Sequence, residues 1–222
     1  MFILAPSLLS ADFSDLTEEI RKIEEAGAEY LHLDIMDGHF VPNITFGAPV
    51  VKCIRPVTDM VFDVHLMIEN PEKYIEDFAK AGADILNVHA ETVGNLKEII
   101  DKIHALGCKA GVTIKPDTPL SAIENVLDCV EMVLVMTVYP GFSGQKLIPQ
   151  ALAKIPVLNN IKKENGYNFD IQIDGGVGLN NLREVLDTGA NIVVAGSAVF
   201  SSPDPAKASR QFLEIFKEYE NV

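Results

Sequence analysis

Histidines and a carboxylate stand among apolar residues in two strand-like segments of the sequence. In the segment 30–36, His32 and Asp34 alternate with two leucines and an isoleucine, and His65 lies in a similar segment further on. A period of two is typical of a β-strand, on which residues two positions apart point to the same side. His32 and Asp34 are therefore neighbours on one face, just before the Asp37-Gly38 turn that ends the strand. Such a pair can bind a metal ion or move protons.

Strand-like and helix-like segments alternate along the whole chain, a pattern typical of parallel strands joined by helical crossovers. About eight such pairs predict an α/β fold of the (β/α)8 TIM barrel type, with eight parallel strands inside a ring of helices. The strands are expected at residues 3–8, 30–36, 60–67, 85–89, 109–114, 132–138, 169–174 and 192–195. Helices are expected near residues 14–27, 49–55, 95–106, 117–127 and 204–219, among others.

Length and composition fit one domain. A chain of 222 residues with 48% hydrophobic residues can bury one large core, so residues 1–222 are expected to form a single barrel. The net charge of −14 disfavours nucleic acid and anionic membranes as partners, and no apolar run is long enough to span a bilayer. The three cysteines are widely separated, which predicts no disulfide framework and favours a reducing, cytoplasmic location.

The carboxyl ends of the strands of a parallel barrel meet at one mouth, so residues there converge although they are distant in sequence. Six polar residues fall at these ends: Ser7, His32, Asp34, His65, His89 and Asp174. Two histidines and two carboxylates among them form a mixed nitrogen and oxygen set, which suits one divalent Zn, Fe, Mn or Co ion per subunit. A single buried histidine is more often a core residue, but four convergent groups favour a metal site: His32, Asp34, His65 and Asp174. For His89, a substrate contact and a supporting role behind the ligands both stay open.

Glycine-rich turns follow the last three predicted strands. Glycines let backbone N–H groups approach a ligand closely, and the phosphate sites of TIM barrels are commonly built from these late loops. Oriented amides can hold a phosphate even on an acidic protein. Each cluster alone could be a tight turn, but three in successive loops favour a phosphate site, with these candidates: Gly141, Phe142, Ser143, Gly144, Gly175, Gly176, Gly196 and Ser197.

Methionines stand near the ends of three of the predicted strands, at Met36, Met67 and Met136. Methionine often fills irregular gaps in a core, and this explanation is the simpler one from the residues alone. Alternatively, the three thioethers shield an electron-rich reaction intermediate from water.

A metal on one side of the mouth and a phosphate site on the other predict a small phosphorylated ketose as the substrate. An ion that touches a carbonyl and the neighbouring hydroxyl would stabilise the ene-diolate formed when the carbon between them loses a proton. Asp34 and Asp174 come from different sides of the mouth and could address opposite faces of that carbon. Removal of a proton on one face and return of one on the other inverts the carbon. The predicted reaction is therefore a two-base epimerisation, in which the two carboxylates hold different protonation states.

The chain resembles the ribulose-phosphate 3-epimerase family, essentially from end to end. The resemblance rests on six segments, of which the second is the most specific: Ala5-Pro6-Ser7, His32 to Asn43, Asp63 to Met67, Pro140-Gly141-Phe142, Asp174 to Val177 and Ala195 to Phe200. It implies a metal-dependent isomerase of the pentose phosphate pathway, which inverts C3 of D-ribulose 5-phosphate to give D-xylulose 5-phosphate. It also implies a homo-oligomer, either a dimer or a hexamer.

The same resemblance assigns roles to individual residues. The four convergent side chains would be metal ligands, with Asp34 as the proton acceptor and Asp174 as the donor in one direction. Ser7 and His65 would contact the substrate, and the glycine loops would hold its phosphate. Met36, Met67 and Met136 match positions around the intermediate, which favours the shielding role.

Two departures from the family pattern lie in one loop. The family has Asn and Gly where this chain has Tyr139 and Ser143, which leaves the metal and carboxylate positions unchanged but could affect the length of the sugar. D-allulose-6-phosphate 3-epimerase is therefore the first alternative. A decarboxylase or aldolase barrel would carry the strand pattern Asp-x-Lys-x-x-Asp, and here His65 and Ile68 replace its Lys and second Asp. A metal-binding barrel without catalysis would leave the pair of Asp34 and Asp174 unexplained.

Overall fold

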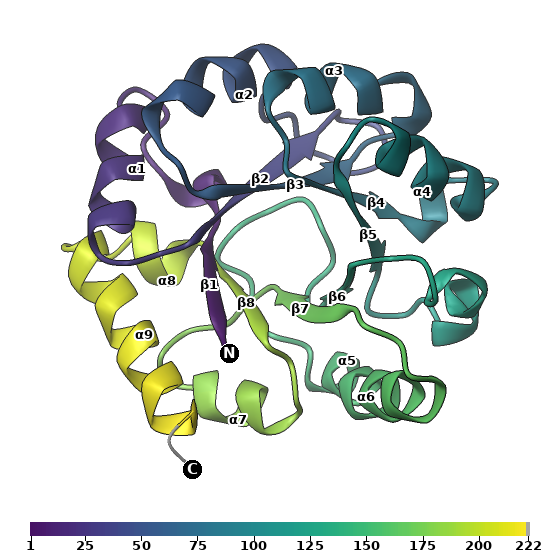
Figure 1. Ribbon diagram of the computed structural model, residues 1–222. Coiled ribbons are helices and arrows are strands. Elements are labelled where there is room, and N and C mark those ends of the chain that lie inside the picture. Colours follow the sequence, from purple (N-terminus) through teal and green to yellow (C-terminus); the bar gives the residue numbers. More distant parts are fainter. Residues whose placement is uncertain (221–222) are drawn as a thin grey trace.

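Eight parallel strands form one sheet that curls into a barrel, and helices surround it (Figure 1). The structure, a computed structural model, describes residues 1–220. Each strand from β2 to β8 pairs with its neighbour in sequence, and β1 pairs with β8. This confirms the predicted (β/α)8 TIM barrel. The strands are β1 (Ile3–Pro6), β2 (Tyr30–Met36), β3 (Val61–Met67), β4 (Ile85–His89), β5 (Lys109–Ile114), β6 (Met132–Met136), β7 (Asp170–Asp174) and β8 (Ile192–Ala195).

Helices connect most of the strands and cover the outside of the barrel (Figure 1). They are α1 (Leu16–Glu25), α2 (Ala48–Ile54), α3 (Ile75–Ala81), α4 (Leu96–Ala105), α5 (Pro149–Leu152), α6 (Lys154–Asn165), α7 (Leu182–Asp187), α8 (Ser197–Phe200) and α9 (Pro205–Glu220). Within residues 1–220, no helix combines the length and the apolar character needed to cross a bilayer.

The connection from β5 to β6 differs from the prediction. A helix was expected at 117–127, but the segment forms two short 3-10 turns, Leu120–Ala122 and Glu124–Val126. Side chains from elsewhere take up its first polar groups, since Lys154 Nζ donates to the Thr118 carbonyl oxygen at 2.7 Å. Between the turns, Ile123 has φ −125° and ψ −3°, which interrupts a helix, and its side chain is fully buried. Tertiary contacts therefore override the local helical pattern.

The register of the strands sets which side chains become neighbours. His32 on β2 lies opposite Asp63 on β3, and two residues further on Asp34 lies opposite His65. Outward residues of β2, including Leu31 and Leu33, belong to the main hydrophobic core. As expected from the period of two, β2 buries an apolar face outward and its ionisable face inside the barrel.

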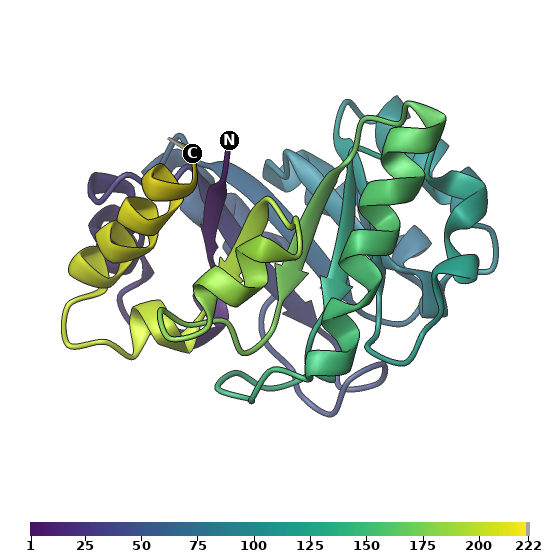
Figure 2. The same ribbon diagram turned by 90° about the horizontal axis from the view of Figure 1, so that it is seen from below.

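The side chains inside the barrel change from apolar to polar along its axis. Its amino end is filled by a separate apolar cluster, formed by Ala5, Tyr30, Ile85, Met132, Ile192 and Val194. Above this cluster lies a polar layer in which all four side chains are fully buried: His32, Asp63, Asn87 and Gln172. The loops near residues 40 and 140 project from the end of the barrel opposite the N-terminus (Figure 2).

The barrel closes between β1 and β2 through few contacts. No continuous ladder joins the two strands, and one isolated bridge links Ser7, just after β1, to His32 on β2. On its outer side β1 is held by α9, because Phe2 packs against Phe216 at a ring distance of 5.7 Å and against Tyr219 at 6.0 Å. β8 and the last helix therefore help to position the first strand of the barrel.

Candidate active site

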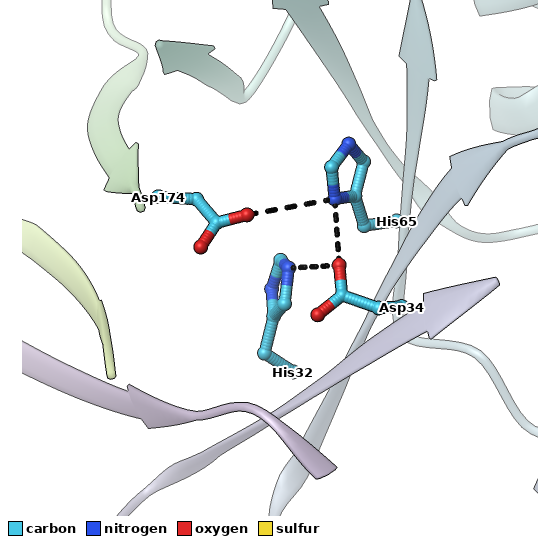
Figure 3. Close-up of side chains that lie close together, drawn as sticks. All are labelled: His32, Asp34, His65 and Asp174. Atoms are coloured by element: carbon cyan, nitrogen blue, oxygen red, sulfur yellow. Dashed lines mark hydrogen bonds and ion pairs between the residues drawn. The ribbon is translucent and has the colours of Figure 1, made fainter. Parts of the chain in front are cut away.

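Four ionisable side chains meet at the carboxyl ends of β2, β3 and β7 (Figure 3). His65 Nδ1 lies 3.0 Å from Asp34 Oδ1 and 4.0 Å from Asp174 Oδ2, and His32 Nε2 lies 3.3 Å from Asp34 Oδ1. One ligand atom from each residue falls within 4.8 Å of the others. This span is roughly twice the metal–ligand distance of about 2.0–2.2 Å in zinc sites. The four residues predicted as ligands are thus brought together in one cluster.

The state of His32 tests whether the cluster fits a metal ion. Its Nδ1 donates a hydrogen bond to Asp63 Oδ2 at 2.7 Å, so the lone pair of the neutral ring is on Nε2. That nitrogen faces the cluster, is fully buried and makes no well-aligned hydrogen bond, and the Asp34 Oδ1 atom lies 3.3 Å from it. A buried polar atom without a partner costs about 1–3 kcal/mol, and a metal ion would remove that cost. The residues therefore fit a divalent cation.

Asp63 holds this arrangement from behind. Its carboxylate accepts hydrogen bonds from Asn87 Nδ2 and Gln172 Nε2, both at 2.5 Å, in addition to the one from His32. The donors come from β2, β4 and β7, and all four side chains are fully buried. Outer carboxylates of this kind fix the ring orientation and tautomer of a metal-binding histidine.

Asp34 lies at the centre of the cluster and is 3% exposed. Its Oδ2 accepts a hydrogen bond from Ser7 Oγ at 2.6 Å, while its Oδ1 faces the two imidazoles. Burial by itself raises the pKa of Asp34, but His32 and His65 outweigh it and hold this pKa well below its usual value. Burial lowers the pKa of His32, but Asp34 and Asp63 outweigh it and hold that pKa well above its usual value. His32 Nε2 therefore holds a proton next to Asp34, and a metal ion bound at Nε2 would replace that proton and leave the neutral ring. Asp34 is therefore an ionised carboxylate in this environment.

The pKa of Asp174 is shifted in the opposite direction, above its usual value. Burial, followed by the negative charge of Asp34, raises the pKa of Asp174 to about 6. Its side chain is 16% exposed, because it lies at the open end of the barrel. Two carboxyl groups whose surroundings push their pKa values apart are the arrangement that acid and base catalysis requires.

His89 lies on the far side of His65. The two rings approach through their Nε2 atoms at 2.9 Å, and His89 Nδ1 lies 3.0 Å from Glu91 Oε2. Burial lowers the pKa of His89 to about 4. Hydrogen bonds from His89 and from the Lys115 backbone outweigh burial at Glu91 and lower its pKa to about 2. The structure thus places His89 behind a candidate ligand, and it is not among the residues that line the cavity described next.

A cavity of about 290 Å³ opens over the two carboxylates. Its lining contains Asp34, Asp174, Ser7 and all three predicted methionines, which are 3%, 1% and 1% exposed. Every residue predicted for the phosphate site also lines it: Gly141, Phe142, Ser143, Gly144, Gly175, Gly176, Gly196 and Ser197. His65 and Tyr139 are not in the lining, since His65 is fully buried below and Tyr139 is 53% exposed outside.

The glycine loops have backbone conformations and contacts that larger residues could not adopt. Gly176 has φ +70°, and a Cβ atom there would lie 2.3 Å from the backbone nitrogen of Leu147. The loop after β6 is folded by Gln145, whose Nε2 donates to the carbonyl oxygens of Tyr139 and Phe142. Asn43 Nδ2 donates to the Gly141 carbonyl oxygen at 2.9 Å, which ties this loop to the one after β2.

Sequence reasoning missed the supporting residues Asp63, Asn87, Gln172 and Glu91. A usable signal was present, because a polar residue stands two positions before His65, His89 and Asp174 in each strand. Residues two apart on a strand share a face, so these three form a deeper polar layer below the mouth.

An eight-stranded barrel with ionisable groups at the carboxyl ends of its strands has the organisation of a TIM-barrel enzyme. Asp34 and Asp174 lie under a small cavity, and their pKa values are shifted in opposite directions. This arrangement is typical of enzymes that transfer protons on a small substrate. Comparison with known proteins makes the assignment specific. Residues 3–200 match the ribulose-phosphate 3 epimerase family, and the chain belongs to that family.

Two named relatives are similar in sequence to this chain over nearly its whole length. Ribulose-phosphate 3-epimerase from Synechocystis sp. is 52% identical over 208 residues, which cover 93% of this chain and 90% of the relative. The protein of the same name from Bacillus subtilis is 51% identical over 209 residues, which cover 94% of this chain and 96% of the relative. Among solved structures, KGPDC from Streptococcus mutans has a TM-score of 0.76 at 14% identity and covers 98% of this chain and 99% of that one. The similarity to KGPDC shows a common fold alone.

We predict that Asp63→Asn destabilises the protein by about 1–3 kcal/mol, the cost of buried polar groups that lose partners. An amide offers one acceptor oxygen and adds its own N–H donors, whereas three donors converge on the native carboxylate. The free energy of unfolding in urea measures the effect. Asp59→Asn, on the exposed surface, is the matched control. Equal stability of the two variants would show that the buried carboxylate is not required.

Proposed function

We propose that the chain is a metal-dependent epimerase that inverts C3 of D-ribulose 5-phosphate to give D-xylulose 5-phosphate in the pentose phosphate pathway. The observation that carries this proposal is the pair of carboxyl groups, Asp34 and Asp174, on the floor of one cavity with pKa values shifted in opposite directions. The names of the relatives support the choice of substrate.

The two carboxyl groups divide the proton transfers between them. Asp34 is ionised and accepts the proton from C3. Asp174, whose pKa is raised to about 6, takes up a proton more readily than Asp34 and in its protonated form donates to the opposite face of the same carbon. The carbon is inverted, one proton is lost and one is gained, and the roles exchange in the reverse direction. No redox cofactor is needed, because no electrons leave the substrate.

His32, Asp34, His65 and Asp174 would hold one divalent ion. When bound, the ion supplies positive charge next to the two substrate oxygens that become negative as the proton leaves. Mixed imidazole and carboxylate ligation favours Zn, Fe, Mn or Co over Mg. The unpaired His32 Nε2 supports this ligand set.

The remaining lining residues would bind and protect the substrate. The glycine loops after β6, β7 and β8 would hold the phosphate through backbone amides. The three thioethers of Met36, Met67 and Met136 would exclude water from the electron-rich intermediate. Ser7 would contact the sugar while its hydroxyl holds Asp34. For His65, which lies below the cavity, we propose the ligand role, with any substrate contact made through the cluster.

We also propose the setting in which the enzyme works. Residues 1–222 would act as a single domain, although residues 221 and 222 lie outside the described part of the chain. Three cysteines without disulfides among the described residues support a reducing cytoplasm. The family resemblance supports a homo-oligomer, either a dimer or a hexamer.

A comparison of two sugars tests the proposed substrate. At equal metal loading, kcat/KM for D-ribulose 5-phosphate should exceed that for D-allulose 6-phosphate, because the cavity lies near the lower end of the range of about 300–1,000 Å³ for ligand pockets. Tyr139→Asn restores the family residue and should leave this ratio unchanged, since Tyr139 does not line the cavity. Preference for the six-carbon sugar would change the named function.

Asp174→Asn tests the two-carboxylate mechanism. The variant should fold normally but lose about 10²–10⁴-fold in kcat, the usual contribution of a general acid or base. Asp34 should still exchange the C3 proton of one epimer with deuterium from the solvent, which NMR detects. Asp170→Asn, at the other end of β7, is the control. Normal turnover by Asp174→Asn would rule out the mechanism.

Metal removal tests the cation. Thorough chelation should abolish epimerisation, and one of the four transition ions should restore it. The same ion should raise the midpoint of thermal unfolding in proportion to the logarithm of its concentration, because it binds the folded state. Full activity of a metal-free preparation would contradict this part of the proposal.

A further inference from the structure

A line of hydrogen-bonded groups leads from the candidate metal ligand His65 away from the cavity. His65 Nε2 lies 2.9 Å from His89 Nε2, and His89 Nδ1 lies 3.0 Å from Glu91 Oε2. Both imidazoles are fully buried, and the Phe40 ring packs on His89 at a ring distance of 4.7 Å. The rings are therefore held in place, and what remains to be fixed is the position of each proton.

Glu91 determines which atom donates and which accepts in each of these hydrogen bonds. Its other oxygen, Oε1, accepts hydrogen bonds from the Lys115 backbone N–H at 2.8 Å and from the Thr118 hydroxyl. A carboxylate held by such donors can only accept, so Oε2 accepts from His89 and the His89 proton is on Nδ1. The lone pair of neutral His89 is then on Nε2, where it must accept from His65.

The same logic extends to the metal site. His65 donates from Nε2, so Nδ1 is the nitrogen left for an ion. Nδ1 lies at hydrogen-bond distance from Asp34 Oδ1, at 3.0 Å, and 4.0 Å from Asp174 Oδ2, and a bound ion would replace its proton and take up the lone pair. This nitrogen faces the cluster that would hold the ion. The arrangement parallels that of His32, whose Nδ1 proton is held by Asp63 so that Nε2 is free.

We propose that His89 and Glu91 are positioning residues that set the tautomer of His65, so that its Nδ1 lone pair is presented to the metal ion. The inference rests on the proposed function for the presence of that ion. Neither residue lines the cavity, so neither touches the substrate. The two histidine ligands are thus oriented by different outer carboxylates, one in direct contact and one through a second imidazole.

Glu91→Gln is the sharpest variant, because it changes the direction of the line with almost no change in shape. The amide oxygen should stay with the two fixed donors at Lys115 and Thr118. The amide nitrogen then faces His89 Nδ1 and donates to it, which moves the His89 proton to Nε2. Two N–H groups now oppose each other between His89 and His65 whenever His65 presents its Nδ1 lone pair.

Zinc affinity, measured by competition with a chromophoric chelator, gives a readout that does not depend on turnover. We expect about 10- to 100-fold weaker zinc binding by Glu91→Gln, the usual effect of losing an outer partner of a metal-bound histidine. The control Glu164→Gln makes the same charge change at an exposed position of α6 and should bind zinc like the wild type. Equal affinity of the two variants would overturn the inference.

A second measurement uses the wild-type protein, without a substitution of His65, His89 or Glu91. In zinc-loaded wild-type protein labelled with ¹⁵N-histidine, the NMR spectrum should show His89 protonated on Nδ1 and unprotonated on Nε2. The opposite tautomer of His89 would overturn the inference even if the variant fails to fold. If the wild-type protein binds no zinc or other divalent ion, the proposed function itself fails, which distinguishes the two outcomes.

Discussion

The Asp63 carboxylate is fully buried inside the barrel, and the site above it depends on how that charge is compensated. Side chains from three other strands, His32, Asn87 and Gln172, donate hydrogen bonds to it. A buried charge without such partners would cost several kcal/mol, so the strands must be in the register that brings all three donors together. The same register places Asp34 opposite His65. Structural stability and the geometry of the metal ligands therefore have a common origin.

Much of the barrel could be predicted from local patterns. The bounds of β4, β5 and β8 agree with the prediction to the residue. The predicted helix at 117–127 was wrong, and the cause lies outside the segment: Glu91 and Lys154 hold its first polar groups from elsewhere in the fold. A prediction made from the residues of the segment itself cannot include these distant partners.

The site was predictable to a similar degree. The candidate ligands and the glycine loops could be predicted because strand ends converge in any parallel barrel, and the structure gathers those residues in one cluster and around one cavity. The layer beneath was missed, because Asp63, Asn87 and Gln172 matter only through contacts across strands. The direction of the line through His89 depends on two donors from the loop after β5, so it requires atomic positions.

The closure of the barrel between β1 and β2 has a consequence for the order of assembly. Ser7, which holds Asp34, follows a strand that pairs with β8 and packs against α9, at the opposite end of the chain. Contacts between such distant segments have a high loop-closure cost and raise contact order. Part of the support that holds Ser7 in its native position therefore comes from the last strand and helix of the chain. A nascent chain that lacks its carboxyl-terminal part therefore lacks some of the contacts that place the Ser7 hydroxyl on Asp34, although both residues were made early.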